Sequence, residues 1–280
     1  MLEFIPSIGS VISYGFSSVT AKKAITILGR HKAIVYAYVV LVILLAMGVL
    51  ILKEQLNFPI DLFPFYLFEI SMGAIGAMAA YKAMDYGKVT ITSPVGKIYV
   101  LFVLAGSIIF LGEELSAGQV LGSIIMVLSA LVLSLDNKGK LKPEKWMFYL
   151  GISIACRAFY FTFIKNFVII FGPYLATFLL ETGIAAFTVL YHTINRRDLS
   201  LPPIDKMKYA AAPGVLIFVG SIFYNFSISY IGAALTAAIS AGGPIVSAIG
   251  GYLLLKEKLD LKKYAAIILM VLGLVMIFVF

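Results

Sequence analysis

Residues 86–128 read YGKVTITSPVGKIYVLFVLAGSIIFLGEELSAGQVLGSIIMVL, and residues 230–272 read YIGAALTAAISAGGPIVSAIGGYLLLKEKLDLKKYAAIILMVL. A shift of 144 residues lays the first stretch on the second without a gap. This shift places Gly106 on Gly250 and Glu113 on Glu257, and each copy is an apolar run, a charged turn and another apolar run. Because a repeat governs the whole architecture, it must be recognised before any single helix or loop is assigned. The chain is expected to be two copies of one helical membrane unit.

The composition indicates that lipid is the main solvent of this chain. Of its 280 residues, 61% are apolar and 13% are charged, whereas soluble domains average about 25% charged. The net charge of +8 arises from basic residues in short turns between apolar runs. Such residues set topology and contact anionic headgroups, so we expect membrane lipids as partners and no nucleic acid. The single cysteine, Cys156, excludes a disulfide framework within the chain.

The apolar runs predict the number of membrane-spanning helices. A spanning helix needs about 20 mainly apolar residues, and ten segments fit, at about residues 4–20, 33–52, 62–84, 89–112, 117–135, 146–164, 168–191, 209–229, 232–255 and 261–280. The expected fold is an all-α membrane protein with ten transmembrane helices in two five-helix repeats. The first repeat covers residues 1–135, a polar linker covers 136–145, and the second repeat covers 146–280.

Five helices per repeat is an odd number, so the two halves enter the membrane from opposite sides. Inverted repeats of this kind are typical of secondary transporters, which hold substrate near the midplane between the halves. Lysine and arginine are concentrated in the loops after the odd-numbered segments, which places those loops in the cytoplasm and both termini outside. Two intact repeats complete the site within one chain, so a monomer can suffice.

The repeated stretches resemble the EamA-type transporters of the drug/metabolite transporter superfamily. In that family each half carries a glycine-containing apolar helix, a Glu-containing turn and a glycine-bearing closing helix. The matching stretches here are residues 104–115 with 118–135, and residues 249–259 with 263–280. The resemblance implies a carrier for amino acids, drugs, sugars, nucleotide sugars or other metabolites. It also implies both termini in the cytoplasm, which conflicts with the charge count.

Two glutamates recur in the turns of the repeat, and four ionisable residues lie well inside expected helices. For Glu113 and Glu257, near helix ends, we expect a capping or loop contact. The four inner residues are Glu69, Lys97, Arg157 and Glu181. A charge at the helix centre costs about 2.5–3.5 kcal/mol on insertion scales, so it faces the bundle interior or a water-filled cavity.

The four inner charges have two interpretations. They neutralise one another and hold the bundle together, or they line a central cavity. In the cavity interpretation, Lys97 and Arg157 attract a carboxylate or phosphate. Glu181 or Glu69 then binds a substrate amine or carries a coupling proton. This set suits an amphoteric or anionic metabolite better than a cationic drug.

Polar and aromatic side chains inside the helices extend the candidate substrate site. Tyr160 is three residues from Arg157 and shares its helix face. Tyr224 and Asn225 form an adjacent polar pair, and these three complete the predicted substrate-binding set. Tyr99 is two residues from Lys97, so a continuous helix points it away by about 200°.

Several classes of protein have no support in the sequence. No phosphate-binding loop is present, so ATP-driven pumping is not expected. The two histidines, His31 and His192, lie near turns, and we expect no metal site and no cofactor. An intramembrane enzyme lacks a nucleophile and base that can be named, and a scaffold has no need of midplane charges.

The sequence therefore predicts a multi-pass secondary transporter of the inner or cytoplasmic membrane. It exports a small polar metabolite, amino-acid-like or anionic, by alternating access between the two halves. The alternative is an uptake carrier for a sugar or a phosphorylated metabolite.

Overall fold

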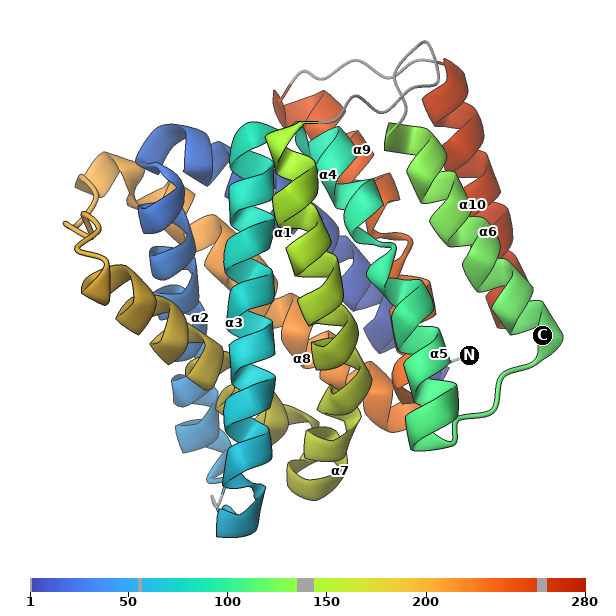
Figure 1. The fold of residues 1–280 in the computed structure, drawn as a ribbon, viewed down its shortest axis with the longest axis horizontal. Coiled ribbons are helices and arrows are strands. Elements are labelled where there is room, and N and C mark those ends of the chain that lie inside the picture. Colours follow the sequence, from blue (N-terminus) through green and yellow to red (C-terminus); the bar gives the residue numbers. More distant parts are fainter. Residues whose placement is uncertain (1, 55–56, 135–143, 256–260) are drawn as a thin grey trace.

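The computed structural model describes residues 2–54, 57–134, 144–255 and 261–280, and these contain helices and no strand. Figure 1 shows the helices as one bundle. In chain order they are α1 (Ile5–Leu28), α2 (Arg30–Leu52), α3 (Phe63–Tyr86), α4 (Val89–Gly96), α5 (Tyr99–Leu111), α6 (Ala117–Ser134), α7 (Lys145–Ile194), α8 (Met207–Ser240), α9 (Gly243–Leu255) and α10 (Leu261–Val279). Short 3₁₀ turns cover Leu2–Phe4, Ile60–Leu62 and Ile204–Lys206.

Helix breaks explain where the structure departs from the expected segments. The sequence predicts a turn between residues 164 and 168, but α7 is helical there and breaks at Gly172, whose φ is 76°. Gly232, with φ of 81°, breaks α8 in the same way. This left-handed backbone region is open to glycine at little cost. Each of these long helices is therefore two arms joined at a glycine.

Two expected segments are interrupted near their middles. The segment at 89–112 is divided into α4 and α5, and at the division the amide of Lys97 bonds to the Pro94 carbonyl, three residues earlier, at 3.0 Å. The segment at 232–255 is divided between Ser240 and Gly243.

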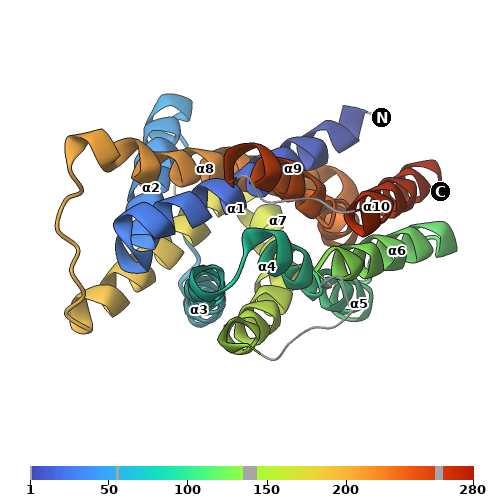
Figure 2. The same ribbon diagram turned by 90° about the horizontal axis from the view of Figure 1, so that it is seen from above.

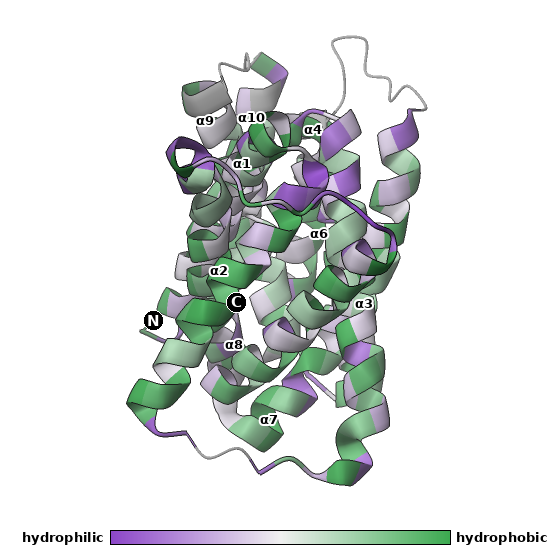
Figure 3. Cartoon of the chain, turned by 90° about the vertical axis from the view of Figure 1, so that its left-hand side faces the viewer, coloured by the Kyte–Doolittle hydropathy of each residue, from purple (hydrophilic) through white to green (hydrophobic). Residues whose placement is uncertain are grey.

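The two ends of the bundle differ in charge. We call one the basic end. The last residues of α1 and α3 and both ends of α7 lie there (Figure 1). Its cations include Lys22, Lys23, Arg30, Lys32, Lys82, Lys88, Arg196, Arg197, Lys206 and Lys208. At the opposite end lie Gly172, Gly232 and the turn between α5 and α6. Among the described residues, Lys53 and Lys165 are the cations nearest that end. Figure 3 shows hydrophilic stretches gathered near the basic end, above largely hydrophobic helices.

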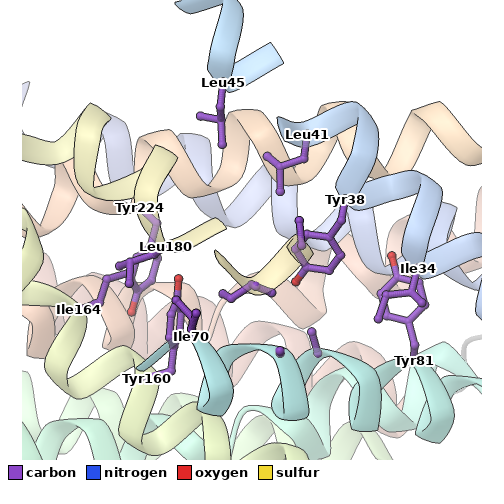
Figure 4. Packing of buried hydrophobic residues seen from close by; sticks show 14 of the residues in the cluster. Ile34, Tyr38, Leu41, Leu45, Ile70, Tyr81, Tyr160, Ile164, Leu180 and Tyr224 are labelled. Atoms are coloured by element: carbon purple, nitrogen blue, oxygen red, sulfur yellow. The ribbon is translucent and has the colours of Figure 1, made fainter. Parts of the chain in front are cut away.

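The helices pack in long-range pairs, chiefly α3 with α7, α1 with α8, and α6 with α10. Figure 2 shows α6 and α10 side by side at one edge of the bundle. A buried cluster between α2, α3, α7 and α8 holds aliphatic and aromatic side chains together (Figure 4). Its members include Ile34, Leu41, Ile70 and Leu180. This packing fixes the inner helices around the space described next.

The helices are long and apolar enough for a membrane. Five helical stretches among the described residues meet that criterion, at Arg30–Leu52, Ile60–Tyr86, Val89–Leu111, Lys145–Ile194 and Ile204–Ser240. Shorter apolar helices cover Ala117–Val132, Gly243–Leu253 and Tyr264–Val279. Most of the expected linker at 136–145 lies outside the described residues.

Candidate functional site: a charged cavity between the two halves

A cavity of about 150 Å³ lies inside the bundle. Its wall comes from α1 to α5 of the first half and from α7, α8 and α9 of the second half. The volume is on the order of ten times the space that one water needs. Lining residues Ala21, Met84 and Thr92 lie within about two turns of helix ends at the basic end. The cavity therefore occupies the half of the bundle nearer to that end.

Lys97 enters the cavity at the interruption between α4 and α5. Its Nζ lies 3.4 Å from the Ser240 Oγ, at the matching interruption between α8 and α9. The same Nζ lies 5.6 Å from the centre of the Tyr99 ring, which also lines the cavity. The prediction that Tyr99 points away from Lys97 is wrong, because it assumed a continuous helix. Two broken helices thus meet at a cation.

Arg157 and Tyr160 line the cavity together from α7, as their three-residue spacing predicts. Glu181, on the second arm of the same helix, also lines it and is 7% exposed. The ion pairs of the described chain are elsewhere: Arg30–Asp85, Lys32–Asp198 and Lys165–Glu113. No ion pair within 4 Å therefore joins the cavity cations to the cavity carboxylate in the described residues.

Glu69 is fully buried on α3, with 0% exposure, and is not part of the cavity wall. Neither of its carboxyl oxygens has a hydrogen-bond partner in the described part of the chain. Gly73, one turn along α3, does line the cavity, and a Cβ built there would lie 3.2 Å from the ring of Tyr160. The carboxyl is thus one helical turn from the wall rather than in it.

Tyr224 and Asn225 also lie outside the cavity wall. Both are buried on α8, and the Asn225 amide donates to the Thr177 hydroxyl at 2.7 Å. The ring of Tyr224 lies 6.3 Å, centre to centre, from that of Tyr14, which does line the cavity. The structure therefore brings Lys97, Arg157, Tyr160 and Glu181 together, and leaves Glu69, Tyr224 and Asn225 behind the wall.

Three further tyrosines complete the wall and were not singled out as site residues from the sequence. Tyr14 of α1, Tyr38 of α2 and Tyr81 of α3 all line the cavity. Figure 4 shows Tyr38, Tyr81 and Tyr160 among the buried aliphatic side chains. The four-residue spacing of Gly73, Ala77 and Tyr81 marks one face of α3. That spacing is the signal by which Tyr81 could have been found.

Glu113 makes a contact of a different kind at the opposite end. Its Oε1 accepts from the Lys165 Nζ at 2.6 Å and from the Ala233 amide at 2.8 Å, while Oε2 accepts from the Ala234 amide at 2.7 Å. The expected capping contact is present, but the capped helix is the α8 arm that follows Gly232. Glu257, its partner in the repeat, lies outside the described residues.

Comparisons with known proteins agree with the fold and with the repeat. The model of the EamA-like transporter family matches the chain twice, over residues 3–135 and 144–279. The uncharacterised protein MJ1333.1 of Methanocaldococcus jannaschii is 28% identical over 97 residues, which span 35% of this chain and 67% of that protein. A solved crystal structure with 14% identity superimposes with a TM-score of 0.80 and covers 98% of this chain and 95% of its own. At that identity the likeness shows the fold alone.

Proposed function

Because the chain belongs to the EamA-like transporter family, we propose that it is a secondary transporter that carries a small polar metabolite by alternating access. Membership makes it an integral multi-pass membrane transporter of the drug/metabolite transporter superfamily. The substrate class proposed is amino-acid-like or anionic, and the proposed membrane is the inner or cytoplasmic membrane. The proposed domains are residues 1–135 and 146–280 with a linker at 136–145, and the two matched stretches, 3–135 and 144–279, support this division.

One observation carries the proposal: a single cavity gathers Lys97, Arg157 and Glu181 without an ion pair among them. Charges in a membrane interior are costly unless they pair or face a cavity. Unpaired charges of both signs can each find a partner on an amphoteric substrate. Arg157 suits a carboxylate, because its guanidinium binds with two parallel hydrogen bonds. Glu181 suits an amine. The tyrosines supply ring faces and hydroxyls between them.

The proposed architecture is ten spans in two inverted five-helix repeats. The two arms of α7 count as separate spans, while α4 with α5 is one broken span. The arm 233–240 with α9 is the matching broken span of the second repeat. Discontinuous spans that meet at a midplane site are a recurring design of secondary transporters. The crossing of these spans at Lys97 and Ser240 supports this reading.

The direction that we propose is export, with the cavity as the loading site. The excess of lysine and arginine at the basic end supports a cytoplasmic location for that end, and the cavity lies nearer to it. Substrate then loads from the cytoplasm. The resemblance to the family suggests cytoplasmic termini, which would turn this end outward and favour uptake. Labelling of a cysteine placed at Ser200, from one side of the membrane at a time, decides between the two orientations.

A phosphorylated metabolite is the second candidate, favoured by two cations, Lys97 and Arg157, in one cavity with a single carboxylate. A coupling proton also belongs to the proposal, carried by Glu181 or Glu69. A substrate-loaded vesicle assay with and without a pH gradient tests the proton. An accumulation ratio that is independent of the gradient would remove proton coupling.

The substrate class is tested by thermal shift on the purified protein. The panel contains amino acids, polyamines, sugars, phosphorylated metabolites and cationic drugs, with Arg157→Ala measured alongside. Stabilisation by one class that is lost in Arg157→Ala supports the proposal. Stabilisation that survives the substitution places Arg157 outside the site. The compound selected is then followed in counterflow between vesicles, and an absence of exchange would overturn the transport proposal.

A further inference from the structure

We propose that Glu113, Lys165 and the first turn of the α8 arm after Gly232 form a gate, which closes the transport pathway at the end opposite the cavity. The buried polar residues beneath this gate are, in the same proposal, the closed half of the pathway. The inference rests on the proposed transport function, because a pathway with one open half and one closed half requires alternating access. Its evidence is a separate set of contacts that shares no residue with the cavity charges.

The gate joins three elements through one carboxylate. Glu113 follows α5 in the first half, whereas Lys165 and Ala233 belong to α7 and α8 of the second half. The side chains of Glu113 and Lys165 are 9% and 23% exposed, so the contact is largely shielded by protein. A carboxylate at a helix N-terminus satisfies amides that have no partner within the helix. All these contacts are polar, and they lie beside an apolar cluster that holds Val103 of α5 and Ala234 of the α8 arm.

A column of buried polar side chains leads inward from the gate. The Thr236 hydroxyl donates to the Gly232 carbonyl at 2.7 Å and lies 2.7 Å from the Ser227 hydroxyl. Ser227 in turn contacts the Ser7 hydroxyl of α1, so the column crosses from the second half to the first. These side chains are all buried. The hydroxyl pair of Ser7 and Ser227 lies within the close packing of α1 against α8.

The column continues to the cavity through Tyr224 and Asn225. Both side chains are at most 2% exposed. The Tyr224 hydroxyl and the Asn225 Oδ1 nevertheless lack a hydrogen-bond partner in the described chain. Buried polar atoms are normally satisfied, so each unpaired one calls for an explanation. Partnership with substrate or water in the other conformation explains both. The Tyr224 ring is 6.3 Å from that of Tyr14 on the cavity wall, which connects the two regions.

The location of the cavity supports the same assignment. Its lining residues extend from the basic end to the level of Lys97 and Glu181, and none of them belongs to the gate or the hydroxyl column. An alternating transporter must separate its halves on the closed side to release substrate there. The polar contacts that join the halves on that side are those of Glu113 and Ser7, and ring contacts such as Phe4 with Phe278 join them as well. Breaking them is the step that opens the column.

The test measures access to the column from the gate side. Cys156 is first replaced by alanine, and Thr177→Cys is introduced as a reporter beside Asn225. Right-side-out and inverted vesicles are exposed to a membrane-impermeant thiosulfonate, and the labelling rate is measured in the presence and absence of Glu113→Gln. Glu114→Gln is the matched control, because Glu114 is the adjacent carboxylate and is exposed. A second reporter, Ser227→Cys, guards against failure of the first to fold.

We expect Glu113→Gln to raise the labelling rate about fivefold or more, from one side of the membrane only, and Glu114→Gln to leave it unchanged. A cysteine at Ser18, on the cavity wall, is expected to label from the other side in the same vesicles. Equal labelling in Glu113→Gln and its control, with folded protein in both, would overturn the gate and make Glu113 a structural cap. If labelling rises but counterflow detects no transported compound, Glu113 controls access to the buried column, while the transport proposal and with it the role of a transport gate fail.

Discussion

Replacement of Gly122 by alanine is expected to destabilise the protein, although alanine is the better helix former. Gly122 lies on α6 where it meets α10, and a Cβ at this position would be 2.6 Å from the Gly273 carbonyl oxygen. It would also be 3.1 Å from the Ile277 Cγ1 and the Met276 Cβ. The nearest atom is backbone, so the strain cannot be relieved by a rotamer change. The two helices must move apart.

The magnitude follows from two opposing terms. Overpacking of a tight contact costs about 1–3 kcal/mol, and replacing a helical glycine by alanine returns about 0.5–1 kcal/mol. The net loss for Gly122→Ala is therefore about 0.5–2 kcal/mol. Gly151→Ala is the matched control, because Gly151 is helical, exposed and has no heavy atom within 4 Å of a built Cβ. This control is expected to gain about 0.5–1 kcal/mol.

The assay is the apparent melting temperature of purified protein in detergent. We expect Gly122→Ala to melt below the parent and Gly151→Ala to melt above it. Gly273→Ala meets the same contact from the other side, at 2.7 Å from the Gly122 carbonyl oxygen, so the double variant should lose less than the sum. Transport per folded molecule is expected to be unchanged, because neither helix lines the cavity. A rise in melting temperature for Gly122→Ala would refute the close-approach argument.

Three further outcomes are expected. Glu181→Gln is expected to weaken binding of an amine-bearing ligand about 10–100-fold, because one charge-assisted contact is lost. Glu69→Gln is expected to leave the affinity unchanged, and calorimetry measures both variants. Gly232→Ala destabilises the fold in thermal melts, because φ is 81° and a Cβ would lie 2.7 Å from the Glu113 Oε1. A hydrogen bond from Lys32 lowers the pKa of Asp198. The difference in melting temperature between the parent and Asp198→Asn therefore stays constant from about pH 5 to 8, and it declines only below about pH 4, where the unfolded carboxyl takes up a proton.

The repeat and the lengths of the apolar runs were sufficient to predict an all-helical membrane transporter of this family. Element boundaries failed where a charged residue was taken as the end of a helix. Lys165 was assigned to a turn, but it lies within α7 and pairs with Glu113, which is 52 residues earlier. The actual break is at Gly172. Local sequence cannot reveal that a distant carboxylate will neutralise a cation.

The candidate site was predictable where side chains share a continuous helix, as for Arg157 and Tyr160. It was not predictable where a helix breaks. The break between α4 and α5 turns Lys97 and Tyr99 towards the same cavity, which a continuous helix would not do. Tyr224 and Asn225 have the polarity of cavity residues but lie behind its wall, because the packing of α8 against α1 and α7 decides which face is open. Position along a helix was readable from the sequence, whereas the direction of a side chain was set by tertiary contacts.

The symmetry of the scaffold and the asymmetry of its chemistry have a common physical explanation. The repeat aligns Arg157 with Ser13 and Glu181 with Ala37. The cavity holds one cation from each half, Lys97 and Arg157, and its carboxylate, Glu181, comes from the second half alone. An amphoteric substrate also lacks twofold symmetry, so its two charged ends require different partners. Two related halves can enclose such a substrate only if each has diverged, and Lys97, the one cation that the described residues of the first half contribute to the cavity wall, aligns with Ala241 in the repeat.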